Sequence, residues 1–285
     1  MKSKLLALAL AVSASFSAFA GPVQALPEVP LFVKFTGAEQ IAISGNTGYA
    51  NEISWGVFTV STINPGVVTE ANKQIASTGG PFFVDRVFGG GAGGAQITGI
   101  FYGIEAGTTP TAANPFPGAF GYMDLYWRDL SIYSATDIGT VSTTGPVVRT
   151  TQSTAAGFTD GTILAHIVFT AGITTDPTVT VSGSQVPTSA GFTGQSDFFA
   201  NVVAGSGAWA DQLNSNYFTT VLGTQADLKF KNSYNYLPQW NGGSNILGAK
   251  IDDPAQAFVV PEPGALSLMG LALVGMGALR RRKQK

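Results

Sequence analysis

The sequence predicts an all-β body of the β-sandwich or jelly-roll kind, lying between two short terminal segments. Short apolar segments, several with period-two alternation, recur along the chain, and Gly, Asn and Pro separate them. This pattern is typical of strands joined by turns. Helical periodicity is scarce, and no repeat of fixed length is visible, which argues against a solenoid or a propeller. Phe, Trp, Tyr, Val and Ile are frequent enough to exclude a disordered chain.

The first element in chain order is typical of a secretory signal peptide. Lys2 and Lys4 precede an apolar run over residues 5–12, and small residues then lead to Ala18-Phe19-Ala20. This is the order of a basic region, an apolar region and a small-x-small cleavage site. We therefore predict a signal peptide over residues 1–20, read by the Sec export machinery and cleaved after Ala20. A second small-x-small site, Val23-Gln24-Ala25, leaves the cleavage point open by a few residues.

The body, residues 21–259, follows as a series of expected strands. The clearest alternation lies in 122–133, where Met123, Leu125 and Trp127 face one way and the residues between them face the other. Short helices are expected over 69–77 and 208–214, and a split into two domains near residues 183–194 is the alternative organisation. The expected strands are 31–35, 52–63, 82–88, 96–105, 122–133, 162–170, 178–182, 197–203 and 226–231.

Charge and cysteine content exclude several classes of function. The chain has 15 Lys or Arg against 17 Asp or Glu, and seven of the basic residues lie in the two terminal segments. The body is therefore acidic and has no basic patch for phosphates, so we expect no nucleic-acid partner. The chain has no cysteine, which excludes disulfide bonds and zinc sites built on thiolates.

Two features carry weak signals of catalysis or nucleotide binding. His166, the one histidine, lies in the apolar segment Leu164-Ala165-His166-Ile167-Val168. We interpret it as a partly buried strand residue rather than the base of a Ser-His-Asp site. Residues 89–94 match G-x-G-x-x-G, but a strand is expected after them, where a dinucleotide site needs a helix. We interpret this segment as a hairpin loop.

The scattered carboxylates could form a glycosidase pair or a calcium site, but no spacing in the sequence identifies either one. Calcium accepts carboxylate and carbonyl oxygens, but no EF-hand or nonapeptide loop is present. We therefore predict no catalytic residue, no metal ligand and no cofactor, with calcium as the alternative. A turn is the preferred interpretation of Asp252-Asp253-Pro254. The acids weighed as members of a pair, whose carboxyl groups must stand about 5 to 9 Å apart, are Asp124 with Asp129, Glu105, and Asp252 with Asp253.

Aromatic side chains offer a third kind of site, because their rings can stack on sugars. Trp55 and Trp127 are expected to fill the core between sheets. Trp240 lies in a polar loop, residues 238–243, where an exposed ring would be useful. Trp240 and Tyr236 are therefore the candidate glycan contacts.

The C-terminal segment, residues 260–285, combines three features in a fixed order. Pro261-Glu262-Pro263 precedes an apolar run over residues 264–279, and Arg280, Arg281 and Arg282 follow at once. At about 1.5 Å per residue the run is slightly short of a bilayer core of about 30 Å, and the flanking arginines can snorkel to cover the deficit. A basic cluster beside a span stays cytoplasmic, so the body lies on the far side, where the signal peptide also sends it.

These features resemble the PEP-CTERM sorting signal, which exosortases process in Gram-negative bacteria. The resemblance implies transient insertion of the 264–279 helix into the inner membrane and removal of the tail near Pro261-Glu262-Pro263. It further implies that the body is released or attached at the cell surface, often in bacteria that make exopolysaccharide. Such tails occur on many unrelated proteins, so the resemblance leaves the activity of the body open.

Together these observations predict an exported surface or extracellular-matrix protein without catalysis. We expect it to support biofilm formation, flocculation or association with exopolysaccharide, its expected partner beside exosortase and the Sec machinery. The alternatives are a carbohydrate-binding module and a polysaccharide-active hydrolase.

Overall fold

The structure is a computed structural model that describes residues 23–43, 45–69, 74–87, 94–107, 116–188, 191–243 and 245–259. The predicted signal peptide over residues 1–20 and the predicted sorting tail from residue 260 lie outside these ranges, as do residues 88–93 of the glycine-rich segment. The described part is predominantly β, which confirms the predicted all-β class. None of its helices is long and apolar enough to cross a bilayer.

The described elements comprise long strands, short accessory strands and short helices. The long strands are β1 (Pro30–Ala42), β2 (Glu52–Thr69), β5 (Ala95–Ala106), β6 (Phe116–Asp129), β9 (Thr162–Thr170), β10 (Val181–Thr188), β11 (Gly191–Val202), β14 (Leu228–Tyr236) and β15 (Ile246–Phe258). The short strands are β3 (Gln74–Ser77), β4 (Phe83–Val84), β7 (Arg149–Thr151), β8 (Thr154–Ala155), β12 (Phe218–Thr219) and β13 (Gln225–Ala226). The helices are α2 (Ile138–Thr144), α3 (Ala210–Leu213) and the 3₁₀ turn η2 (Pro238–Trp240).

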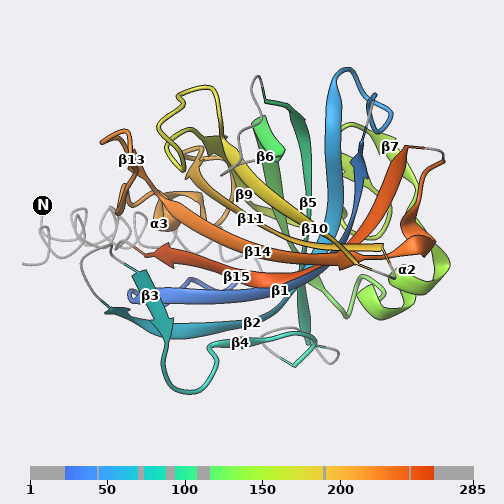
Figure 1. Ribbon diagram of the computed structural model, residues 1–285. Coiled ribbons are helices and arrows are strands. Elements are labelled where there is room, and N and C mark those ends of the chain that lie inside the picture. The colour runs from blue at the N-terminus through green and yellow to red at the C-terminus, as the bar shows by residue number, and fades with distance from the viewer. Residues whose placement is uncertain are drawn as a thin grey trace, which may run out of the picture.

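The long strands form one antiparallel sheet that closes on itself as a barrel (Figure 1). Neighbours follow the chain order from β1 through β2, β5 and β6, and from β11 through β14 to β15. β9 and β10 run in the same direction and together fill the one position between β6 and β11. The ring closes because β1 pairs along its length with both β15 and β2.

The predicted β-sandwich or jelly-roll is therefore corrected to a closed barrel with strands in sequential order. Sandwich and barrel strands both bury one face, so the period-two pattern is the same in each. The barrel differs from a sandwich in the pairing of β1, which pairs on its second edge with β2 and so leaves no gap in the ring. Residues 183–194, the alternative domain boundary, lie within the β10–β11 hairpin of this same sheet.

Most expected strands are confirmed, and their alternation correctly gives the two faces of the sheet. On β6, Met123 and Trp127 lie in the barrel core, whereas Tyr122 packs in a separate cluster outside it. On β14, Leu228 and Phe230 are buried, and Lys229 and Lys231, which alternate with them, are more exposed.

Two local expectations are wrong, and one helix was not expected. Part of the expected helix 69–77 is strand β3, which pairs with the end of β2. The expected turn Asp252-Asp253-Pro254 lies inside β15, a strand that the sequence pattern did not indicate. The pairing of β15 with β14 skips residues 253 and 254, which accommodates a proline that has no N–H to donate. Helix α2 was also missed.

The barrel interior holds the main hydrophobic core, and one end is closed by other parts of the chain. Trp209 and Leu213, at the start and end of α3, belong to this core together with Leu26. The indole N–H of Trp209 donates to the backbone oxygen of Gln24 at 2.7 Å, and the Leu26 N–H donates to the Gln212 side chain at 3.1 Å. The N-terminal stretch and α3 thus form a plug at this end.

The outer face of β1, β2 and β5 is covered by α2, η2 and the segment after α2. Trp55, Ile100 and Phe158 belong to the resulting second core. The segment is anchored by a buried ion pair in which the Arg149 guanidinium contacts both carboxylate oxygens of Glu52, at 2.6 and 3.0 Å. Because this cover lies outside the ring, it leaves the barrel interior unchanged.

Candidate functional site: a cavity inside the barrel

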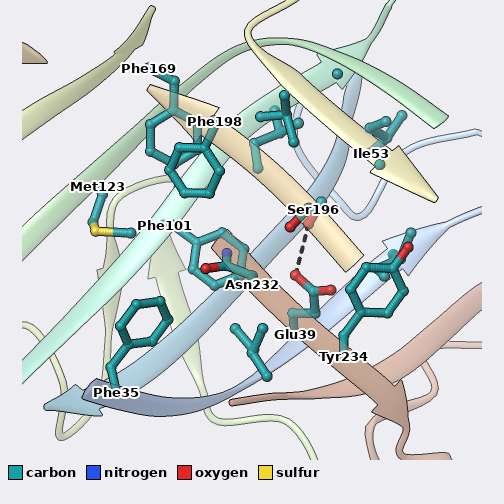
Figure 2. Close-up of a pocket in the computed structure, with 17 residues that line it drawn as sticks. Phe35, Glu39, Ile53, Phe101, Met123, Phe169, Ser196, Phe198, Asn232 and Tyr234 are labelled. Atoms are coloured by element: carbon teal, nitrogen blue, oxygen red, sulfur yellow. Dashed lines mark hydrogen bonds between the residues drawn. The ribbon is translucent and has the colours of Figure 1, made fainter. Parts of the chain in front are cut away.

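The end of the barrel opposite the plug contains a cavity of about 100 Å³. One water takes about 30 Å³ in the liquid, so the cavity is larger than a single water needs. Figure 2 shows polar side chains, among them Glu39 and Tyr234, on the right, and Phe35, Met123 and Phe169 on the left. Ile41 and Ile53 also line it and are partly exposed, so they mark its mouth.

Glu39 is the central polar group of this cavity. Its position on β1 follows the period-two pattern, because Leu31, Phe35 and Ile41 point inward and Glu39 lies on the same face. The residue is only 8% exposed, and its described hydrogen bond comes from the Ser54 hydroxyl at 3.4 Å. Burial raises the pKa of Glu39 from 4.5 to about 8, and the Ser54 hydroxyl offsets part of this rise.

Two further polar side chains face the same space from β14. Asn232 is 9% exposed, and its Oδ1 atom is buried without a hydrogen-bond partner. Tyr234 donates its hydroxyl to the backbone oxygen of Ser184 at 2.7 Å. Burial, followed by the proximity of Glu39, raises the pKa of Tyr234. The cavity therefore holds oxygen atoms with unused acceptor capacity beside a tyrosine whose donor is already engaged.

A second cavity of about 50 Å³ lies next to the first, on the side of the plug. Phe35 and Met123 line both cavities, and Leu26, Trp209 and Leu213 line the far end of the second. All of the named lining side chains of the second cavity are hydrocarbon, indole or thioether groups. The barrel interior is thus polar near its mouth and apolar along the rest of its axis.

The outer face of the barrel brings together two residues that the sequence had separated. Asp124 on β6 and His166 on β9 are cross-strand partners, and His166 Nδ1 lies 2.5 Å from Asp124 Oδ1. The Tyr102 hydroxyl donates to the other Asp124 oxygen at 3.2 Å, and the His166 ring stacks on Tyr122 with 5.9 Å between centroids. The Ser206 hydroxyl accepts from the His166 backbone N–H at 2.9 Å, so this serine is engaged by the backbone.

The predicted glycan contacts do not form an exposed aromatic platform. Trp240 is 0% exposed, because it packs in the second core against Trp55 and donates its indole N–H to the backbone oxygen of Val141 at 2.9 Å. The expectation of an exposed Trp240 ring is therefore wrong. Tyr236 is partly buried against Phe192. Trp55 and Trp127 are buried, as predicted.

Among the described side chains, none of the candidate carboxylates lines either cavity inside the barrel. Asp124 is paired with His166, whereas Asp129 caps a turn by accepting from the Ser131 N–H at 2.9 Å. Glu105 pairs through its backbone with Ala119, and Asp252 lies on β15. Within the described residues, no three acidic or histidine side chains gather to hold a metal ion. The absence of a cofactor, with calcium as the alternative, stays a prediction.

A wider polar groove of about 440 Å³ lies outside the barrel between β1, β2 and α2. Hydroxyl groups of Thr36, Thr59 and Ser61 line it together with Asp85 and Lys250. Asp85 forms an ion pair with Arg86 at 3.3 Å, and burial raises the pKa of Asp85. The groove therefore presents hydroxyls and charges of both signs.

Sequence reasoning missed the interior cavity, although a signal for Glu39 was present. The expected strand 31–35 ended seven residues before β1 does, so Glu39 fell outside it. Extending the alternation of Leu31 and Phe35 to Ile41 places Glu39 on the apolar face. An acid on that face is the pattern that indicates a functional group in an interior.

Comparison with known families supports the assignment of the C-terminal segment. A family model described as the PEP-CTERM protein-sorting motif matches residues 259–283. Neither the curated proteins nor the solved structures include a match to this chain. The resemblance of the tail is thereby confirmed, and the activity of the body must be argued from its own geometry.

Proposed function

From the premise that this chain is a PEP-CTERM sorting-domain protein, exported and sorted by exosortase, we propose that its barrel body binds a small, largely apolar molecule without catalysis. The observation that carries this proposal is the cavity inside the barrel with Glu39 and Asn232 buried in its wall. Ligand sites are typically apolar hollows with a few converging polar groups and a perturbed pKa. The cavity has each of these features.

The energetic cost of the buried polar groups supports a functional role. An unpaired polar group in an apolar interior costs about 1 to 3 kcal/mol, and Asn232 Oδ1 is such a group. Glu39 has a single described hydrogen bond, and that bond is long. Phe35 on β1 and Phe230 on β14 lie in the same barrel core, so these strands can face the interior with apolar side chains and the core itself does not require polar groups.

The position of the chain's histidine supports the part of this proposal that excludes catalysis. His166 faces the outside of the barrel, whereas Glu39 faces the inside, so His166 is separated by the wall from a molecule in the cavity. A mechanism that needs an imidazole base has no such base in the cavity. We therefore expect no turnover by the exported protein on a panel of glycans and esters.

A blocking substitution at the mouth tests the binding proposal. Ile53 lines the cavity and is partly exposed, so Ile53→Trp should fill the entrance and weaken binding of an apolar fluorophore such as N-phenyl-1-naphthylamine by at least about tenfold. Ile132→Trp is the matched control, because Ile132 is 72% exposed and lies outside the cavity lining. Equal fluorophore affinity in both variants and the wild type would contradict binding in the cavity.

Association with exopolysaccharide is the second candidate, and the outer groove favours it. Sugar hydroxyls form hydrogen bonds with hydroxyl and charged side chains of the kind that Thr59, Ser61 and Lys250 supply. On this proposal the protein would support biofilm or flocculation through the groove. Ser61→Trp should then reduce retention of the protein on the host's own polysaccharide, with Ile132→Trp again as the control. Unchanged retention in Ser61→Trp would exclude the groove.

A further inference from the structure

We propose that the barrel cavity is a site for a primary aliphatic amine, whose ammonium group lies between Glu39 and Asn232 and whose unbranched chain follows the barrel axis past Met123. This inference rests on the proposed function, that the cavity binds a ligand, and adds the chemical class of that ligand. Different lining residues indicate the ammonium head group and the unbranched tail of this ligand.

The polar wall of the cavity requires a ligand that donates hydrogen bonds. The buried atom without a partner is Asn232 Oδ1, which can only accept. Glu39 receives one long bond from Ser54, so its carboxyl group also has capacity to accept when ionised. The hydroxyl of Tyr234, which might serve a ligand acceptor, already donates to Ser184. An ammonium group supplies three donors and no acceptor, which matches this wall.

The charge of the lining selects an ammonium over a carboxylate. No Lys, Arg or His is among the described residues that line the cavity, and Glu39 is its acidic group. A fatty carboxylate would find no cation in this lining to neutralise its charge. An alkylammonium instead forms an ion pair, which favours the ionised carboxyl. Because the pKa of Glu39 is about 8, ionising it near neutral pH costs little.

The apolar part of the interior selects a narrow chain. Phe35 and Met123 line both cavities, so a ligand that fills both must pass them. Methionine has three rotatable bonds and adapts to irregular gaps, so an unbranched chain can extend past it. Trp209 closes the far end, so we expect affinity to rise with chain length and then to fall once the chain reaches this plug.

The test uses the exported protein and three homologous series of six to twelve carbons: n-alkylamines, n-alkanols and n-alkanoates. Displacement of N-phenyl-1-naphthylamine gives each affinity. At equal chain length the amine should bind at least about tenfold more tightly than the alcohol, the size expected for a hydrogen-bonded charge, and the carboxylate should bind most weakly. Glu39→Gln should remove the preference for the amine, so that the amine and the alkanol of equal chain length bind with similar affinity.

Two further variants keep the result interpretable. Glu28→Gln alters an exposed acid outside the cavity and should leave the amine preference intact. Asn232→Leu removes the unpartnered acceptor and should weaken amine binding more than alkanol binding, which tests the head site independently of Glu39. Alcohols or carboxylates that bind as tightly as amines would overturn the amine assignment while the cavity remains a binding site. Failure of all three series to displace the fluorophore would overturn both proposals.

Discussion

Glu39 carries most of the chemical character of the interior, and its buried carboxyl should give this protein an unusual pH dependence. The folded protein keeps the Glu39 proton up to a pKa of about 8, whereas the ordinary pKa of an exposed glutamate is 4.5. Between these values the unfolded chain binds fewer protons than the folded one, so the free energy of unfolding falls as pH rises. The stabilisation is complete below about pH 4.5 and is lost by about pH 8.

Glu39→Gln should therefore remove this pH dependence, because glutamine keeps the shape and cannot ionise. Relative to wild type, the variant should gain stability between about pH 5 and pH 8, by as much as about 4 kcal/mol at about 1.4 kcal/mol per pKa unit. Urea unfolding at several pH values measures the difference, and Glu28→Gln serves as the exposed control. Parallel profiles for wild type and Glu39→Gln would show that the carboxyl ionises normally.

His166 belongs to a structural network on the outer face of the barrel. Its Nδ1 contacts Asp124 and its ring stacks on Tyr122, while 30% of the side chain remains exposed. His166→Gln should cost about 1 to 2 kcal/mol of stability through the lost contact with Asp124. Binding of the fluorophore should be unchanged, since His166 lies outside the cavity. A folded His166→Gln protein that lost a measurable hydrolytic activity by orders of magnitude would instead make His166 catalytic.

At the scale of the strand, close packing inside the barrel depends on a glycine in β5. A side-chain carbon at Gly99 would lie 2.3 Å from the Phe58 ring and 2.5 Å from the backbone oxygen of Asp124. A shift of the Phe58 ring would relieve only the first of these contacts. The second is with the backbone of β6, which cannot move without breaking its pairing. Gly99 therefore lets Phe58 fill the centre of the barrel.

Gly99→Ala should destabilise the protein by about 1 to 3 kcal/mol, the usual cost of overpacking a core. Gly80→Ala is the matched control, because an added carbon there meets nothing within 4 Å, and its effect should stay within about 0.5 kcal/mol. Thermal and urea unfolding measure both. Equal stabilities of the two variants would mean that β5 and β6 can separate at little cost.

At the scale of the whole molecule, the position at which the predicted signal peptide is cleaved decides which residues of the plug are retained. Gln24 and Leu26 contact Trp209 and Gln212 at the closed end of the barrel, and cleavage at the second site, after Ala25, would remove Gln24. We therefore expect the mature N-terminus at Gly21, which retains these contacts. Mass spectrometry of the exported protein gives the residue directly, and a mature chain that begins at Leu26 would contradict this expectation.

Sorting should depend on both ends of the C-terminal motif. In a host with a matching exosortase, Glu262→Ala, or deletion of Arg280, Arg281 and Arg282, should leave an unprocessed form in the inner membrane. Cell fractionation and intact mass distinguish this form from the processed one, and Ile132→Trp in the body is the control. Unchanged mass and surface delivery in the tail variants would separate this chain from exosortase processing.

Much of the local structure was predictable because it depends on neighbouring residues. The strand over 162–170 and the two faces of β6 follow from apolar runs and alternation. β15 was missed because Asp252, Asp253 and Pro254 weaken its strand pattern. Its pairing with β1 on one side stabilises the strand despite the low β-propensity of these residues. Trp240 was misplaced because its loop is polar in sequence, yet the ring is covered by α2 and β2 from distant parts of the chain.

The sequence by itself determined the C-terminal sorting motif, the all-β class of the body and the absence of disulfides, since each depends on composition or on contiguous residues. Only the tertiary structure decided that the strands close into a barrel, because closure depends on β1 pairing with both β2 and β15. The same closure places Glu39 beside Asn232, almost two hundred residues away along the chain. Long-range strand pairing determines which side chains share an interior, and hydrophobic periodicity within a strand carries no information about that choice.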